Sequence, residues 1–116
     1  MNGFEATETR KESEIERVFI SACTRFGWEV RKAHWIGHAG AADRIVFAHG
    51  GVTGLAEVKR PRKGLDPLQE EEKAAMARVG HVVWVIKGEG DVLRFVEDMQ
   101  RRVGNAVSAK TVPAGG

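Results

Sequence analysis

The sequence predicts a single α/β domain: a small mixed β-sheet with helices on both faces and elements in the order αβββαβα. Three observations carry this prediction. Apolar residues recur every three or four positions in segments that fit helices, at 9–26, 66–79 and 92–103. Short runs rich in β-branched residues fit strands, at 28–36, 45–47, 52–58 and 81–87. The helix between the third and fourth strands predicts that these two strands run parallel.

The first predicted helix spans residues 9–26, with Thr9 or Ser13 as its cap. Its apolar face repeats with helical spacing, through Ile15, Val18, Phe19, Ala22, Cys23 and Phe26. At 100° per residue, Glu12 falls inside this apolar stripe and Glu16 on its border. An inward glutamate is unfavourable unless something pairs with it. One of the two either caps the helix or serves a polar site.

The middle of the chain reads as a hairpin followed by a capped helix. Residues 49–51, His-Gly-Gly, form the turn between the second and third strands. Asp66 can cap the next helix, with Pro67 at its first position and Gln69 completing a capping box. The fourth strand, 81–87, is apolar throughout, which predicts a central place in the sheet.

Glu57 and Lys59 lie at the end of the third strand. Because side chains alternate along a strand, both point to the same face. Taken alone, this pattern fits an ion pair on an edge strand. Asp43, however, enters the second strand, and the hairpin brings that entry to the same end as Glu57. Two carboxylates and a lysine converging there predict an oxygen site for a hard cation, Mg²⁺ or Mn²⁺.

The string GAADRIVFAHGGVTGLAEVKRPRKGLDPLQ resembles the VRR-NUC branch of the PD-(D/E)xK nuclease superfamily. The resemblance covers residues 12–87 and rests on an ordered set, namely Asp43, Glu57, Lys59, Pro61, Leu65, Pro67 and Gln69. The sequence has Ala42 where the family has a proline that shapes the turn. The resemblance implies a restriction-endonuclease-like αβββαβ core and a metal-dependent deoxyribonuclease.

By this resemblance, Asp43 and Glu57 hold Mg²⁺ or Mn²⁺ with help from the backbone carbonyl of Val58. Glu12 or Glu16 holds a second ion or an ordered water, and the sequence does not decide between them. The metal lowers the pKa of a bound water and stabilises the departing oxygen.

Lys59 is expected to orient the attacking water and offset charge in the transition state. Gln69 has two readings, one as a helix-capping residue and one as a neighbour of the metal and substrate. Basic residues beside the site are expected to bind the DNA backbone, namely Arg60, Arg62, Lys63 and Arg44. A basic cluster of this kind also fits a solvated loop.

The resemblance implies DNA as the substrate. Minimal phage and bacterial members look similar to Holliday junction resolvases, which suggests a homodimer that cuts branched DNA such as four-way junctions. The dimer surface is expected in the first strand or the last helix. One alternative is a non-catalytic nucleic-acid binding module. Another is a protein that recruits a partner through its tryptophans, but Trp28, Trp35 and Trp84 are predicted to be core residues.

Composition adds little about function. The 116 residues carry a net charge of +2, which permits nucleic-acid binding without arguing for it. The single cysteine excludes an internal disulfide, and no Cys/His cluster has zinc spacing. No apolar run could span a membrane and the N-terminus is too charged for a signal peptide, so we expect a cytoplasmic protein of a bacterial cell or phage-infected host. We expect one nuclease domain at 9–104 and disordered ends at 1–8 and 105–116.

Overall fold

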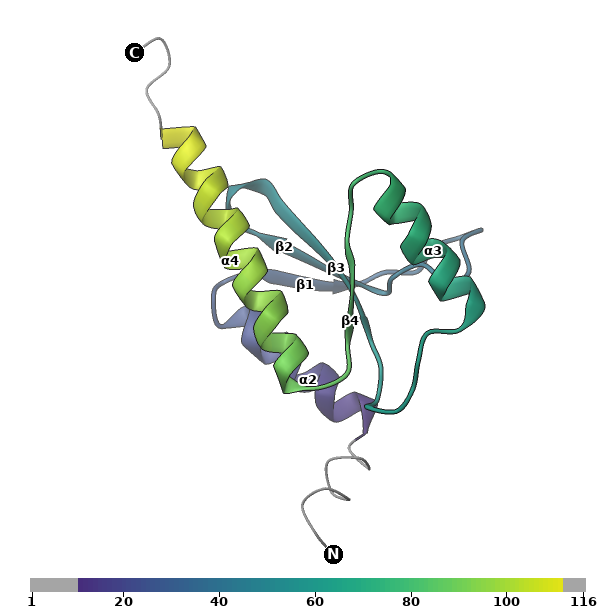
Figure 1. Ribbon diagram of the computed structural model, residues 1–116. Helices are drawn as coiled ribbons and strands as arrows, with labels where there is room; N and C mark the ends of the chain where they lie inside the picture. Colours follow the sequence, from purple (N-terminus) through teal and green to yellow (C-terminus); the bar gives the residue numbers. More distant parts are fainter. Residues whose placement is uncertain (1–10, 112–116) are drawn as a thin grey trace, which may run out of the picture.

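The computed structural model describes residues 11–111 and has the predicted order of elements. In chain order these are α2 (Glu12–Thr24), β1 (Glu29–Lys32), β2 (Arg44–Ala48), the 3-10 turn η1 (His49–Gly51), β3 (Val52–Val58), α3 (Pro67–Arg78), β4 (Val83–Ile86) and α4 (Glu89–Thr111). The strands lie in the order β1-β2-β3-β4, antiparallel except for the parallel pair β3–β4. Helices α2 and α4 cover one face and α3 lies over the other (Figure 1). The predicted mixed α/β sheet is therefore confirmed.

Alternation along β3 decides what each face of the sheet presents. Ala56 and Val58 are buried in the core under α2 and α4, and Gly54 lies against α4. Leu55 and Glu57 point the other way, toward α3. The strand thus fills the core with one set of side chains and offers a carboxylate to the α3 face with the other.

The core lies between the sheet and the α2–α4 layer. Phe19 of α2 and Phe95 of α4 meet with ring centroids 5.0 Å apart, and Trp84 of β4 packs edge-on against Phe95. Cys23 is fully buried there, and burial raises the pKa of its thiol to about 12, as expected of an unreactive core residue. In contrast, α3 contributes no buried residue.

Gly54 marks the closest approach of α4 to the sheet. A Cβ at this position would lie 2.8 Å from both Met99 Sδ and Phe95 Cζ. We expect Gly54→Val to destabilise the fold by about 1–3 kcal/mol, because overpacking outweighs the better strand propensity of valine. Chemical denaturation measures this, with Thr53→Val on the exposed face as the matched control. A Gly54→Val protein as stable as the control would contradict the close packing.

The prediction of a central fourth strand was wrong, because β4 forms an edge of the sheet. The strand is apolar since helices cover both of its faces. Trp84 and Ile86 pack in the α4 layer, while Val83 faces the α3 side.

The first strand is shorter than the predicted 28–36, because the chain leaves the sheet after Lys32. Residues 33–43 form a loop closed at its base by the Ala33 N–H, which donates to the Asp43 carbonyl at 2.8 Å. Trp35 belongs to this loop and is 46% exposed, so its assignment to the core was wrong. Its indole Nε1 donates to the Ala42 carbonyl at 2.6 Å. Trp28 is buried and Trp84 partly buried, in keeping with the prediction.

The helix boundaries also differ from those predicted. The first helix spans Glu12–Thr24 with Lys11 at its N-cap, so Ser13 lies inside it, and Thr9 is outside the described residues. The last helix continues to Thr111. Its added turns pack against the η1 turn, so closely that a Cβ added to Gly50 would lie 3.1 Å from the Ala106 side chain. The part of the predicted tail at 105–111 is therefore helical. Residues 1–8 and 112–116 lie outside the described residues.

Within residues 11–111, every helix is too short or too polar to cross a lipid bilayer.

Candidate active site

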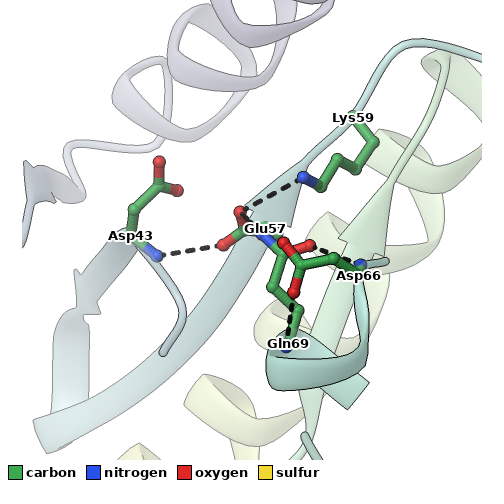
Figure 2. A network of polar contacts seen from close by, with 5 residues as sticks. All are labelled: Asp43, Glu57, Lys59, Asp66 and Gln69. Carbon is green, nitrogen blue, oxygen red and sulfur yellow. Dashed lines mark hydrogen bonds and ion pairs between the residues drawn. The ribbon is translucent and has the colours of Figure 1, made fainter. Parts of the chain in front are cut away.

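Asp43 and Glu57 meet where β2 begins and β3 ends. The register pairs Arg44 with Ala56, so the next residues outward, Asp43 and Glu57, lie opposite one another. The Asp43 N–H donates to Glu57 Oε2 at 3.2 Å (Figure 2). The structure thus brings together the two acids that hairpin geometry placed at one end of the sheet.

The surroundings of Glu57 favour its neutral form. Its side chain is nearly buried, and burial raises the pKa of the carboxyl group from 4.5 to about 7. The charge of Asp43 raises the pKa as well, with a smaller contribution from Glu12. The Asp43 N–H and Lys59 act in the opposite direction. A cation bound next to this carboxyl group would stabilise its charged form.

Asp43 has a buried oxygen that lacks a partner. Its Oδ1 accepts no hydrogen bond from any described residue. An unsatisfied buried acceptor is unfavourable, and a carboxylate more so. The unpartnered Asp43 oxygen and the Glu57 carboxyl group, whose pKa is raised, are together suited to bind a hard divalent cation.

Within residues 11–111, no three Asp, Glu, His or Cys side chains gather into a ready-made metal cage. A pair of carboxylates is nevertheless a sufficient protein contribution for Mg²⁺. This ion keeps several waters and takes one or two carboxylates together with substrate phosphates. The donor set around Asp43 and Glu57 therefore fits this ion.

The two candidate glutamates of α2 have different surroundings. Glu16 forms an ion pair with Arg44 on the α2 face of the sheet. Glu12 is exposed in the first turn of α2, and its charge acts on Glu57. Glu16 is thus occupied by Arg44 and Glu12 is not seen in such a pair within residues 11–111, while both assignments as metal ligands stay predictions.

Lys59 completes the polar cluster. Its Nζ lies 3.9 Å from Glu57 Oε1, and its side chain is only 12% exposed. The Lys59 N–H donates to the Ile86 carbonyl at 2.9 Å, which extends the β3–β4 ladder and fixes the direction of the side chain. Val58, between Glu57 and Lys59, buries its side chain in the core. Only its backbone carbonyl is therefore a candidate metal ligand.

Gln69 caps α3 as predicted and also contacts Glu57, while its place beside a metal and substrate stays a prediction. Its side-chain Oε1 accepts from the Asp66 N–H at 3.0 Å while Asp66 Oδ1 accepts from the Gln69 N–H at 2.9 Å, the two halves of a capping box. Its Nε2 also donates to Glu57 Oε1 at 2.8 Å (Figure 2). The start of α3 is thereby tied to the carboxylate pair.

The predicted DNA-binding residues divide into two groups. Arg60, Arg62 and Lys63 are exposed in the turn that follows Lys59, where the Lys63 N–H donates to the Arg60 carbonyl at 3.0 Å. Arg44 instead lies under α2, largely buried against Glu16, with its Nε lacking a partner among the described residues. The structure therefore brings only the first group to the surface beside the acids.

The loop at residues 33–43 closes the site from the other side. Gly40 has φ +87°, and a Cβ there would lie 2.5 Å from the Leu68 carbonyl carbon and 2.7 Å from the Gln69 nitrogen. His38 Nδ1 lies 3.4 Å from Glu72 Oε1 of α3. The loop is thus packed directly on the start of α3. Gly40 permits this close approach, because it has a positive φ and no Cβ.

Comparison with known proteins gives one informative likeness. No family model matches this sequence, and no curated protein does. Among solved structures, one described as a "VRR_NUC domain" superimposes with a TM-score of 0.70 at 28% sequence identity. The superposition covers 77% of this chain and 97% of that one. Nearly the whole of that domain is therefore represented in the fold described above.

Proposed function

The chain belongs to the VRR-NUC family, a nuclease-type domain, and on this premise we propose that it is a metal-dependent nuclease that hydrolyses phosphodiester bonds in DNA. The observation that carries the proposal is the pair Asp43 and Glu57, in which Asp43 Oδ1 has no partner among the described residues and Glu57 Oε1 lies 3.9 Å from Lys59 Nζ. A non-catalytic binding module would have no use for two adjacent carboxylates, which repel one another without a cation.

Each residue of the site has a distinct task in this reaction. Asp43 and Glu57 would hold Mg²⁺ or Mn²⁺, together with the Val58 carbonyl, and Glu12 would hold a second ion or a water. A cation bound there lowers the pKa of water and stabilises negative charge on the phosphate. Gln69 fixes the Glu57 carboxylate through its 2.8 Å hydrogen bond.

Lys59 would supply a fixed positive charge close to the scissile phosphate. Because its ammonium is held near Glu57 in a mostly buried position, it needs no reorganisation as charge develops on the phosphate oxygens. The same position allows it to orient an attacking water.

The turn of Arg60, Arg62 and Lys63 would grip the DNA backbone next to the reacting phosphate. Contacts of this kind release counterions, so DNA affinity should fall steeply with salt. Arg44, paired with Glu16, would act by fixing the start of β2 next to Asp43.

Branched DNA and a two-fold dimer are the finer parts of the proposal. One copy of this domain carries one candidate active site, while symmetric resolution of a four-way junction requires two incisions. A two-fold dimer supplies both, and it is the commonest small assembly. Exposed apolar residues of the first loop and last helix, such as Ile36 and Leu93, offer surface for it.

A cleavage assay across linear duplex, flap, single strand and four-way junction, with and without Mg²⁺, tests the proposal. We expect cutting only with the cation, fastest on the junction, by a protein that light scattering shows to be a dimer at micromolar concentration. Binding without any cutting would favour the non-catalytic module. Equal rates on all substrates by a monomer would leave a general nuclease.

A further inference from the structure

A cavity of about 210 Å³ lies beside the carboxylate pair, between α3 and the sheet. Its walls are mostly apolar and come from the loop, from β3 and β4 and from α3, chiefly Trp35, Ala41, Leu55, Leu65, Met76 and Val83. Protein interiors ordinarily fill such space, and α3 here buries no residue of its own. The space between α3 and the sheet is therefore open to a ligand.

The cavity is continuous with the candidate active site, because Glu57 and Gln69 line both. In a DNA strand, the sugar and base adjoin the phosphate. A phosphate held by a cation at Asp43 and Glu57 would consequently place a neighbouring base at the mouth of this cavity.

The chemistry of the walls suits a nucleobase. Trp35 presents a partly exposed aromatic ring whose position is fixed by its hydrogen bond to the Ala42 carbonyl. Polar groups at the margin, Gln69, Glu72 and Lys73, can meet the polar edge of a base. An apolar cavity of about 150 Å³ is enough to bind a benzene ring, so the volume is adequate for a flat heterocycle.

The walls are also held in place before any ligand arrives. Gly40 packs on the backbone of Leu68 and Gln69, and the capping box fixes the first turn of α3. A preformed site of this kind binds its ligand without first ordering the loop.

Resting on the proposed nuclease function, we propose that this cavity receives an unpaired nucleobase next to the scissile phosphate. A base within a matched duplex cannot enter without first unpairing and leaving the stack, whereas an unpaired base avoids the cost of unpairing. The cavity would therefore direct the enzyme to DNA with an unpaired nucleotide at the cut, as at a bulge, flap or junction centre.

Binding measurements with Ca²⁺ in place of Mg²⁺ keep an oxygen-binding cation at the carboxylates and test this separately from the cleavage assay. We compare a duplex carrying one unpaired base with the same duplex fully matched, by fluorescence anisotropy. The wild type should bind the first roughly tenfold or more tightly, the scale expected of stacking a base on an aromatic side chain. Trp35→Ala should bring the ratio close to one, and Met76→Phe, which fills the cavity, should do the same.

Two controls separate stacking from structural effects. Trp35→Phe keeps a six-membered aromatic ring for stacking and loses the five-membered ring of the indole with its N–H, so most of the preference should survive. Phe47→Ala removes an equally exposed aromatic on the same face of the sheet that does not line the cavity, and should leave the ratio intact. Thermal melting of each variant reports its folding.

A wild-type ratio of one, or an equal loss in Phe47→Ala and Trp35→Ala, would overturn the proposal. If Trp35→Phe loses as much as Trp35→Ala, the ring acts only as an anchor for the loop and the cavity proposal fails. Preferential binding by a protein that cuts no DNA would instead refute the nuclease function and leave the base-binding cavity standing.

Discussion

Glu57→Gln and Asp43→Asn should each lower DNA cleavage by at least about a thousandfold while the protein stays folded. Each change removes one of the two anionic groups proposed to hold the cation, and a catalytic metal contributes several kcal/mol to stabilising the transition state. Both replacements keep the size and shape of the side chain, so we expect the packing around β2 and β3 and the fold to be preserved. Cleavage kinetics and circular dichroism give the two readouts.

Lys59→Met is the matched variant for this experiment. It removes a charge from the same cluster but takes no oxygen away from the metal site. We expect its turnover to fall by roughly 10²–10⁴-fold, with Mn²⁺ binding by calorimetry close to wild type. Loss of Mn²⁺ binding in Lys59→Met would make the lysine a structural partner of the acids. Wild-type cleavage by Glu57→Gln would refute the metal site itself.

The stability of the metal-free protein should fall as the pH rises from 4.5 to about 7. Burial raises the pKa of Glu57 to about 7 in the folded state, from 4.5. Between these values the folded protein holds a proton that the unfolded chain has released, so each step up in pH favours unfolding. Above pH 7 the effect levels off. Thermal melting of the wild type against Glu57→Gln isolates it, because the variant cannot titrate at this position.

Metal binding should reverse this trend and release protons. A cation binds the carboxylate form, so Mg²⁺ affinity should rise about tenfold per pH unit below the pKa of Glu57 and flatten above it. Calorimetry at pH 6 in buffers of different ionisation enthalpy counts the protons released. Release of none, together with an affinity independent of pH, would place the cation away from Glu57.

The parts of the molecule that the sequence predicted well are specified by neighbouring residues. The capping box of Asp66 and Gln69 is a local pattern, and it forms as predicted. The approach of Asp43 to Glu57 follows from one hairpin with a glycine turn, because alternation and antiparallel pairing leave few other arrangements.

The features that it missed depend on contacts between distant segments. Trp35 leaves the core because its loop packs through Gly40 on α3, a helix distant in the sequence. The last helix outruns its apolar repeat because Ala106 packs against Gly50. Arg44 turns inward because Glu16 is there to neutralise it. None of these pairings leaves a signal within a single short window of sequence.

The Gln69 side chain makes two hydrogen bonds, and together they restrict which residue fits at this position. Capping alone accepts glutamate as well as glutamine at this position, because either reaches back to the Asp66 N–H. Beside Glu57, however, a glutamate would place a second negative charge where an amide now donates. Of the two residues that can complete the cap, only glutamine serves both partners, because its amide oxygen accepts from the Asp66 N–H while its amide nitrogen donates to Glu57.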